Sequence, residues 1–373
     1  MMLPIYKPYL EKYKQSVFDA INSEWISNHG IYIELSTKLL EKLFNIKYCI
    51  LMNNGTSATH CLFKSLKYKY PQINKIYVPN NVFVSPWNCC LMEYNNTQME
   101  VMKMNSDTLN IDVSEEYINT LEKNSAVLIV HNLGNIVNVP RLKRLRPDLI
   151  FIEDNCEGIF GKYENTYSGS SDVSLCSSVS FYGNKTITTG EGGAFFTNDL
   201  DVYKYIKTFY SHGMSEKRYI HNIEGTNYRM TNIQAALLYD QLNDIDNILN
   251  MKKQVYNNYK SLYNKLPNKY TKIFTLLEEE KDTEHSKWMF TLLSDNLDYE
   301  HLEKYMNEKN IQIRPLFYDI HSHSHLLNIN NQHEKIIKNG FMLPSYPELT
   351  NIQQNYIFDC LIEYCILNDI LNK

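Results

Sequence analysis

The sequence predicts an α/β fold in which a large domain, built on a mostly parallel sheet with helices on both faces, precedes a smaller α+β domain. Two observations support this prediction. Up to about residue 200, short apolar runs alternate with segments of helical periodicity, which is typical of strands joined through helices. The chain also has 373 residues, more than a single hydrophobic core usually holds. We expect the large domain to span residues 1–245 and the small domain residues 246–373.

The composition excludes several classes of protein. The net charge of -5 and the isoelectric point near 6.1 argue against a basic surface for nucleic acid. Residues 1–14 lack the apolar core of a signal peptide and no apolar span reaches about 18 residues, so we expect no membrane partner. The eight cysteines form no Cys-x-x-Cys pair and mostly lie in apolar runs, as expected for reduced residues of a cytoplasmic protein.

The first predicted strand leads into a candidate phosphate site. Two helices, at 8–24 and 33–44, precede an apolar strand at 48–52. Gly55-Thr56-Ser57 follows and opens a helix through about residue 66, where free amides and the positive end of the helix dipole favour an anion. The alternative is an ordinary N-cap by Thr56 or Ser57. A Walker A loop is excluded because no Gly-Lys-Ser/Thr follows.

Two later strands also end in residues that can face a ligand. Phe83 follows the strand at 75–79, where ligands gather in open α/β sheets, so it either stacks on a flat ring or is a core aromatic. The apolar run 149–152 ends in an acidic pair that includes Asp154, and a buried carboxylate needs a partner. Asp154 is therefore either a helix N-cap or faces a cationic ligand. Right-handed crossovers would bring these loops and the one after residue 52 to one sheet edge.

A glycine-rich stretch from Ser180 to Gly193 holds one lysine, Lys185. Glycines this close together favour a backbone with positive φ or a close approach to a ligand. A lone lysine held there is a candidate nucleophile that forms a Schiff base with a carbonyl compound or with pyridoxal phosphate. The alternative is a glycine-rich β-hairpin that carries a solvated lysine.

The remaining segments are interpreted mainly as structure. The His321-Ser322-His323-Ser324-His325 motif would bring three imidazoles to one face of a strand, which could bind zinc. No acidic or cysteine ligand lies at a suitable spacing, so we interpret it as a loop and expect no metal. The other expected elements are strands at 99–104, 126–130, 288–293 and 311–314, helices at 243–266, 299–309 and 351–371, and a charged surface loop at 276–285.

Five motifs occur in an order and at spacings that resemble a known family. They are Asn53-Asn54-Gly55-Thr56-Ser57-Ala58, Glu153-Asp154, Ser180 to Lys185, Gly190-Glu191-Gly192-Gly193 and Asn227-Tyr228-Arg229-Met230-Thr231-Asn232. Together they resemble the sugar-nucleotide aminotransferases of the DegT/DnrJ/EryC1/StrS family, which are fold-type I enzymes that use pyridoxal 5'-phosphate. The similarity runs from Trp25 through Leu343-Pro344 and looks closest to perosamine and viosamine synthases. It implies a seven-stranded sheet in the large domain.

The resemblance implies a role for each residue at the cofactor. Lys185 would bind the cofactor covalently and move the proton between cofactor and substrate. Asp154 would pair with the pyridinium nitrogen, an interaction worth about 4 kcal/mol at about 4 Å if the effective dielectric constant is near 20. The other implied contacts are stacking by Phe83, phosphate binding by Gly55, Thr56, Ser57 and Ser180, a phosphate contact by Asn227 across a homodimer interface, and Glu157 beside the ring hydroxyl.

The resemblance also implies the reaction. L-Glutamate would supply an amino group to C4 of a UDP-, dTDP- or GDP-linked 4-keto-6-deoxyhexose, giving an amino sugar such as viosamine or perosamine.

Val82 stands where the family usually has Thr, and Asn155-Cys156 replaces a pair of small residues, but neither change removes a reacting group. Two alternatives remain open: amination at C3, and a non-catalytic regulatory or binding protein of the same fold. The expected substrate contacts are Trp25, Ser27, His29, Tyr182, Arg229 and Arg314.

Overall fold

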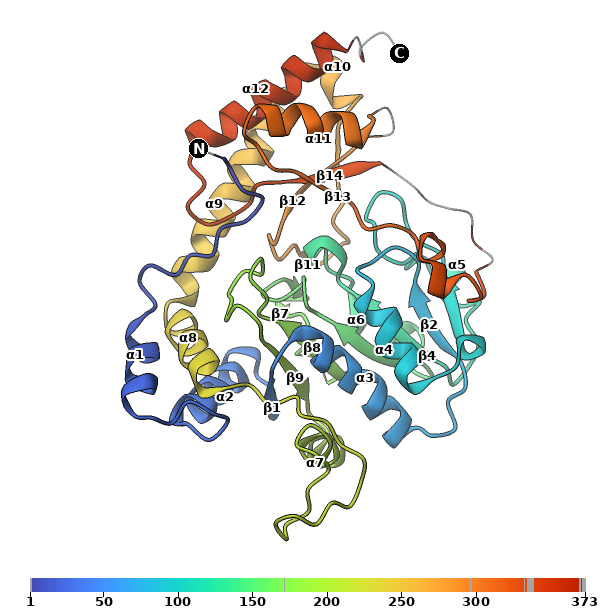
Figure 1. Cartoon of the computed structure of the whole chain (residues 1–373). Helices are drawn as coiled ribbons and strands as arrows, with labels where there is room; N and C mark the ends of the chain where they lie inside the picture. The colour runs from blue at the N-terminus through green and yellow to red at the C-terminus, as the bar shows by residue number, and fades with distance from the viewer. Residues whose placement is uncertain are drawn as a thin grey trace.

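The computed structural model describes residues 2–170, 172–294, 297–331, 333, 339–368 and 370. Seven strands form its central sheet: β1 (Tyr48–Met52), β2 (Ile76–Pro79), β3 (Met99–Met102), β4 (Ala126–Val130), β5 (Ile150–Asp154), β8 (Ser174–Ser180) and β9 (Gly193–Thr197). Their order is β1-β9-β8-β5-β4-β2-β3 (Figure 1). β9 is antiparallel to β1 and β8, and the other pairings are parallel. The predicted mostly parallel, seven-stranded sheet is confirmed.

Helices cover both faces of this sheet, so most residues of its strands are buried on either side. They include α2 (Ile31–Phe44), α3 (Gly55–Lys69), α4 (Ser85–Glu93), α6 (Val139–Leu145), α7 (Leu200–Phe209) and α8 (Asn232–Asn243). Along β1, Ile50 and Met52 pack into the core shared with α3, α4 and α7, whereas Cys49 and Leu51 pack into the core shared with α2 and α8. Successive residues of the strand thus serve opposite faces, as the pleat requires.

α3 starts directly after β1 because Asn54 caps it. The Asn54 side-chain oxygen accepts a hydrogen bond from the Ser57 amide at 2.8 Å. The cap is therefore Asn54, and not Thr56 or Ser57 as the structural alternative supposed. The Thr56 and Ser57 side chains are not used for capping.

The first helix is shorter than the predicted 8–24. α1 spans only Gln15–Asn22. The Tyr13 hydroxyl donates to Asp244 at 2.7 Å, and the Ser16 amide donates to Asp240 at 3.2 Å. These contacts with the end of α8 and the residue after it fix the start of α1, and they override the apolar spacing upstream.

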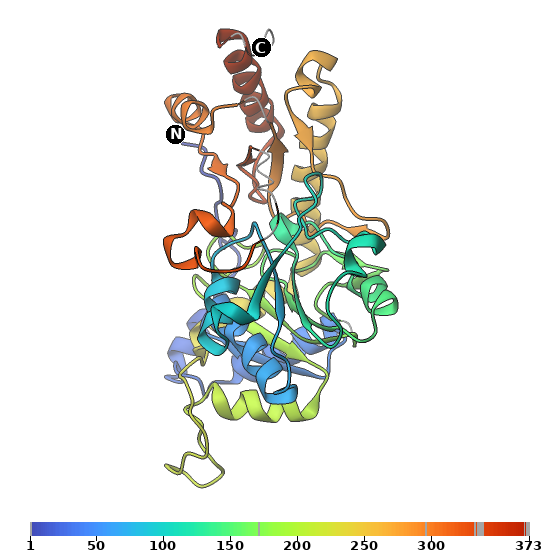
Figure 2. The same ribbon diagram turned by 90° about the vertical axis from the view of Figure 1, so that its right-hand side faces the viewer.

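A second sheet of four antiparallel strands lies beyond the first (Figures 1 and 2). Four described helices share its core: α9 (Ile245–Asn264), α10 (Asn268–Thr271), α11 (Tyr299–Glu308) and α12 (Asn351–Leu367). The helix predicted to reach residue 371 ends at Leu367, and residue 371 itself lies outside the described residues. The strand predicted at 311–314 is confined to the two residues of β13. The four strands, in order across the sheet, are β10 (Thr275–Leu276), β12 (Phe290–Leu293), β14 (Gly340–Leu343) and β13 (Arg314–Pro315).

The N-terminal residues join this second sheet. Leu3 forms a bridge with Ile311, and Leu3 and Tyr6 pack against the core that contains α9, α11 and α12. α9 begins at Ile245, next to the predicted domain boundary. The division into domains 1–245 and 246–373 itself stays a prediction.

A small third sheet contains part of the predicted surface loop 276–285. It consists of β11 (Thr283–Glu284), β6 (Lys162–Tyr163) and β7 (Thr166–Tyr167). In the same segment, Glu280 accepts a hydrogen bond from Arg141 at 2.9 Å. The segment is therefore better anchored than its charge pattern predicted.

None of the described helices combines the length and the apolar character needed to cross a bilayer.

A buried ionic cluster ties α3 to α4. The Glu93 carboxylate lies 3.0 Å from His60 Nε2 and 3.2 Å from Lys64 Nζ. His60 Nδ1 is in turn 2.9 Å from the Tyr228 hydroxyl. Burial acts to raise the pKa of Glu93, but His60 and Lys64 outweigh it and lower this pKa to about 2. The carboxylate is therefore charged in the folded protein at neutral pH.

Candidate active site

A cavity of about 750 Å³ lies between the carboxyl-terminal ends of the parallel strands and the second sheet. This is the sheet edge to which right-handed crossovers were expected to bring the strand-end residues. The predicted site residues that line it are Gly55, Thr56, Phe83, Asp154, Glu157, Ser180, Tyr182, Lys185 and Arg314.

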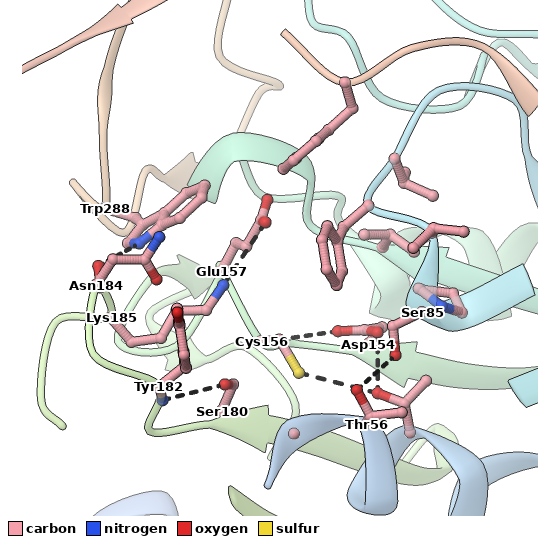
Figure 3. A pocket seen from close by; sticks show the side chains of 18 of the residues that line it. Thr56, Ser85, Asp154, Cys156, Glu157, Ser180, Tyr182, Asn184, Lys185 and Trp288 are labelled. Carbon is pink, nitrogen blue, oxygen red and sulfur yellow. Dashed lines mark hydrogen bonds and ion pairs between the residues drawn. The ribbon is translucent and has the colours of Figure 1, made fainter. Parts of the chain in front are cut away.

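Lys185 lies in the connection between two antiparallel strands, β8 and β9. The glycine-rich stretch is thus a hairpin connection, as the alternative interpretation held. The lysine is not solvated, however, because its side chain is only 11% exposed. Its Nζ lies 3.6 Å from a Glu157 carboxylate oxygen and 4.3 Å from the centre of the Trp288 ring (Figure 3). Its own carbonyl accepts a hydrogen bond from the Tyr6 hydroxyl at 2.6 Å.

Glu157 is held in a fixed position beside the lysine. Its second carboxylate oxygen accepts a hydrogen bond from the Leu133 amide at 2.8 Å, and Leu133 adopts a left-handed backbone with φ of 57°. Burial raises the pKa of the Glu157 carboxyl, and the Lys185 ammonium and the Leu133 amide oppose this effect. The Glu157 carboxyl is therefore fixed beside the Lys185 side chain at the cavity wall.

Asp154 ends β5 and its side chain lies in the cavity wall opposite Lys185 (Figure 3). One carboxylate oxygen accepts from the Thr59 hydroxyl at 3.0 Å, and the other accepts from the Cys156 amide at 3.0 Å. Thr59 also lies 3.0 Å from the Ser178 hydroxyl. The bond from the Cys156 amide belongs to a turn, and among the described elements no helix starts at Asp154, so the N-cap alternative is wrong. Asp154 lines the cavity, and its role towards a ligand stays a prediction.

Glu153, the other member of the acidic pair, serves the structure instead. It is fully buried, and its carboxylate lies 3.0 Å from His131 Nε2 and accepts from the Gly169 amide at 3.1 Å. Successive side chains of a strand point to opposite faces of the sheet, so the Glu153 side chain points away from the cavity that Asp154 lines. Neighbouring carboxylates on β5 therefore have separate partners.

The start of α3 forms a cradle at the same cavity. A Cβ on Gly55 would lie 2.7 Å from the Ser180 Cβ and 2.8 Å from its hydroxyl, so only glycine lets the two segments approach this closely. The Thr56 hydroxyl accepts from Ser85 at 3.1 Å (Figure 3). Hydroxyls and the amide end of a 15-residue helix, lying side by side, suit a phosphate group.

Aromatic side chains border the cavity on another side. Phe83 is 54% exposed and meets Phe317 edge-on, with ring centres 5.9 Å apart. An aromatic side chain this exposed at a cavity wall is not a core residue. Val82, beside it, is buried.

Six predicted residues do not line this cavity. Ser57 is buried within α3, one residue beyond the cradle. The exposed residues of the 25–29 loop are tied instead to Asn232, whose side chain donates to the Trp25 carbonyl at 2.6 Å. Asn227 is exposed at the base of the segment 211–227, which projects from the molecule beyond α7 (Figure 1). The Arg229 guanidinium donates to Ser211 at 3.0 Å. The predicted residues outside the cavity are thus Trp25, Ser27, His29, Ser57, Asn227 and Arg229.

The three histidines of the 321–325 motif have separate partners. His321 lies 3.0 Å from the Ile329 carbonyl and His325 lies 2.8 Å from Asn88. His323 lies against the Trp87 ring and lines the cavity. The motif forms two short 3-10 turns and not a strand, in agreement with its interpretation as a loop.

Comparison with known proteins decides the family. Residues 9–362 match the model of the DegT/DnrJ/EryC1/StrS aminotransferase family. The chain belongs to this family. Members are aminotransferases that depend on pyridoxal phosphate, and the protein is therefore an enzyme of that kind. The predicted resemblance is confirmed.

Individual relatives cover nearly the whole chain. The protein is 30% identical over 371 residues to a GDP-perosamine synthase of Escherichia coli O157:H7, covering 97% of this chain and 98% of that one. It is 29% identical over 382 residues to a GDP-perosamine synthase of Vibrio cholerae, covering 97% and 99%. Among solved structures, the Helicobacter pylori aminotransferase PseC, involved in the biosynthesis of pseudoaminic acid, matches with a TM-score of 0.87 and 22% identity, covering 97% and 99%. This last likeness confirms the fold.

The residues of the cavity fit the cofactor of the family. The cavity holds a lysine in reach of an acidic partner, a carboxylate with two hydrogen-bond donors on the opposite wall, and a glycine cradle at a helix start. These are the groups needed for a carbonyl carbon, a protonated ring nitrogen and a phosphate.

Several residues at the site escaped the sequence analysis. Trp288, Tyr6, Thr59 and Asn184 contact Lys185 or Asp154 or line the cavity. Trp288 was assigned to a strand, but β12 begins at Phe290. Its indole N–H donates to the Asn184 carbonyl at 2.9 Å. No local signal marks Trp288 or Tyr6, whereas Asn184 lies within the Ser180 to Lys185 motif and Thr59 lies in the first turns of the helix that Gly55-Thr56-Ser57 opens.

Proposed function

We propose that this sugar-nucleotide aminotransferase transfers the amino group of L-glutamate to C4 of a nucleotide-linked 4-keto-6-deoxyhexose, giving a 4-amino-4,6-dideoxyhexose such as perosamine. The observation that carries the proposal is the placement of Lys185 and Asp154 on facing walls of one cavity in a chain of this family. The choice of C4 rests on three relatives named GDP-perosamine synthase, 29–30% identical over 90–97% of the chain.

Lys185 is the residue to which we assign the covalent and proton-transfer roles. When bound, pyridoxal phosphate supplies the carbonyl carbon that carries the amino group and a ring that withdraws electrons. Lys185 Nζ anchors that carbon and afterwards takes and returns the proton. Glu157, 3.6 Å away, orients Nζ, and the Trp288 ring excludes water from one side of it.

Asp154 and the cradle orient the rest of the cofactor. The Asp154 carboxylate, held by Thr59 and the Cys156 amide, would pair with the protonated ring nitrogen. Gly55, Thr56 and Ser180 take the phosphate at the start of α3. Phe83 stacks on the ring face, for which its exposure leaves room.

We also propose a homodimer with shared active sites. Asn227, Arg229 and the 25–29 loop lie outside the cavity of their own chain, and Trp25 is 62% exposed. A second chain would place them at the partner's cavity, where Asn227 would contact phosphate and the others the sugar nucleotide. Mixing Lys185→Ala chains with Asn227→Ala chains tests this sharing. If the sites are shared, each mixed dimer has one intact site, and an equal mixture should regain up to about a quarter of the wild-type activity. If each site uses residues of one chain only, mixing should add no activity beyond that of the two variants measured separately.

The position of amination is tested by product analysis. The protein is incubated with L-glutamate and, in turn, GDP-, dTDP- and UDP-linked 4-keto-6-deoxyhexoses and their 3-keto counterparts, and the product is examined by NMR. Nitrogen on C4 of the product supports the proposal, and nitrogen on C3 of a 3-keto substrate supports the first alternative. A protein that binds pyridoxal phosphate yet accepts no amino group from L-glutamate would favour a non-catalytic role. The cytoplasmic location stays a prediction.

A further inference from the structure

Lys252, in the middle of α9, is a buried lysine that the proposed reaction does not use. It is 1% exposed, and no described carboxylate pairs with it. Its Nζ donates to the Trp288 carbonyl at 2.7 Å and to the Ser345 carbonyl, and lies 5.3 Å from the centre of the Tyr6 ring. A cation is costly to bury without an anionic partner. Such a residue calls for an explanation beyond packing.

Three distant segments meet at this lysine. Trp288 leads into β12, Ser345 follows β14, and Tyr6 belongs to the N-terminal segment. The Ser345 amide donates to the Ile5 carbonyl at 3.2 Å, so the segments also contact each other. Lys252 Nζ is thus the point at which α9, the second sheet and the N-terminal segment are joined.

Two of these three segments contact Lys185 directly. The Trp288 ring lies 4.3 Å from Lys185 Nζ, and its indole N–H donates to the Asn184 carbonyl, one residue before the lysine. The Tyr6 hydroxyl donates to the Lys185 carbonyl at 2.6 Å. We propose that Lys252 is a positioning residue that fixes Trp288 and Tyr6 against the side chain and the backbone of Lys185. This inference rests on the role proposed for Lys185.

The contacts of Lys252 need its N–H donors more than its charge. Burial lowers the pKa of Lys252 to about 7, so both forms occur near neutral pH. The neutral amine still has two N–H groups for the two carbonyls. A side chain without donors would leave both buried carbonyls without this partner.

The test measures how fast Lys185 of the apoprotein captures added pyridoxal phosphate, followed by the visible absorbance of the linked cofactor. This readout does not require turnover. Lys252→Met keeps the length of the side chain but removes all donors, and Lys252→Gln keeps two N–H donors without the charge. Lys253→Met, at the exposed neighbour on the same helix, is the matched control. Circular dichroism and thermal unfolding report whether each variant is folded.

We expect folded Lys252→Met to capture pyridoxal phosphate about tenfold more slowly than the wild type, since small misplacements of a reacting group have large effects on rate. Lys252→Gln should recover part of the rate, and Lys253→Met should match the wild type. Combined with Trp288→Ala, Lys252→Met should slow capture by less than the product of the two separate effects, because the lysine acts partly through that residue.

Other outcomes overturn the inference. Folded Lys252→Met that captures at the wild-type rate shows that Lys185 is positioned without it. Effects that multiply fully in the double variant show that Lys252 does not act through Trp288. If neither Lys252 variant folds, the lysine is needed for the fold and the positioning role is rejected. Failure of the wild type itself to capture pyridoxal phosphate would instead refute the role proposed for Lys185.

Discussion

Replacing Asp154 by Asn tests the central electrostatic claim at the active site. The change removes one charge from a side chain that is 5% exposed, and the amide has nearly the same shape. The Asn oxygen can still accept from the Cys156 amide, and the Thr59 hydroxyl can turn to accept from the new NH₂ group. The fold should therefore be retained, and the effect should be confined to the proton on the cofactor ring.

The expected magnitude follows from the geometry of the pair. A carboxylate about 4 Å from a protonated ring nitrogen contributes about 4 kcal/mol at an effective dielectric constant of about 20. Since about 1.4 kcal/mol corresponds to a factor of ten in rate, loss of the charge should slow the chemical step about a thousandfold. Cofactor binding should change less, because the phosphate cradle and Lys185 are intact.

The assay is a single-turnover measurement of the reaction with L-glutamate, followed by the loss of the yellow absorbance of the bound cofactor. Asp201→Asn, an exposed carboxylate at the start of α7, serves as the control and should react like the wild type. A folded, cofactor-loaded Asp154→Asn protein that reacts within tenfold of the wild type would refute the assignment of Asp154.

Three further predictions use the same cavity and its supports. Lys185→Ala should keep the fold but lose at least about 10³-fold in turnover, measured with L-glutamate and a 4-keto sugar nucleotide, because the proton-transferring group is gone; near-normal turnover would contradict this. Gly55→Ala should weaken cofactor binding at least about tenfold in a fluorescence titration, because its Cβ would lie 2.7 Å from Ser180, whereas Gly183→Ala, where a Cβ meets nothing within 4 Å, should bind normally. Glu93→Gln should lower the free energy of unfolding by about 3 kcal/mol at pH 7, because the pKa of Glu93 is lowered from the ordinary 4.5 to about 2. That stabilisation is present above pH 4.5 and is lost as the pH falls towards 2, so urea unfolding curves of the two proteins should converge in acid, and a constant difference would contradict the linkage.

The sequence predicted that residues after the apolar runs converge at one cavity, because that convergence is set by local order along the chain. Phe83 and Asp154 each follow an apolar run that forms a parallel strand, and Gly55 follows the edge strand β1, which runs in the same direction, so all three lie at one edge of the sheet. The convergence of these residues could therefore be inferred from the sequence alone. The position of Lys185 could not, because β9 runs antiparallel to its neighbours and the lysine lies in a hairpin connection.

The parts that were missed depend on how distant segments dock. Trp288 and Tyr6 reach Lys185 only because the second sheet lies over the carboxyl edge of the first. Neither residue belongs to a motif, and contacts between residues more than 100 positions apart leave no periodic signal. The shortened α1 has the same cause, since contacts with Asp240 and Asp244 set its first turn.

The N-terminal segment also sets the order of events during synthesis. The Ile5 amide donates to Gln312, 307 residues further along the chain. At translation rates of about 5–20 residues per second, this segment waits about 15–60 s for its partner to be made. During that interval the large sheet can form, but Tyr6 has no second sheet to lie against, and the carbonyl of Lys185 lacks its hydrogen bond. Nascent chains arrested before residue 312 should therefore hold an ordered sheet and a loosely placed lysine.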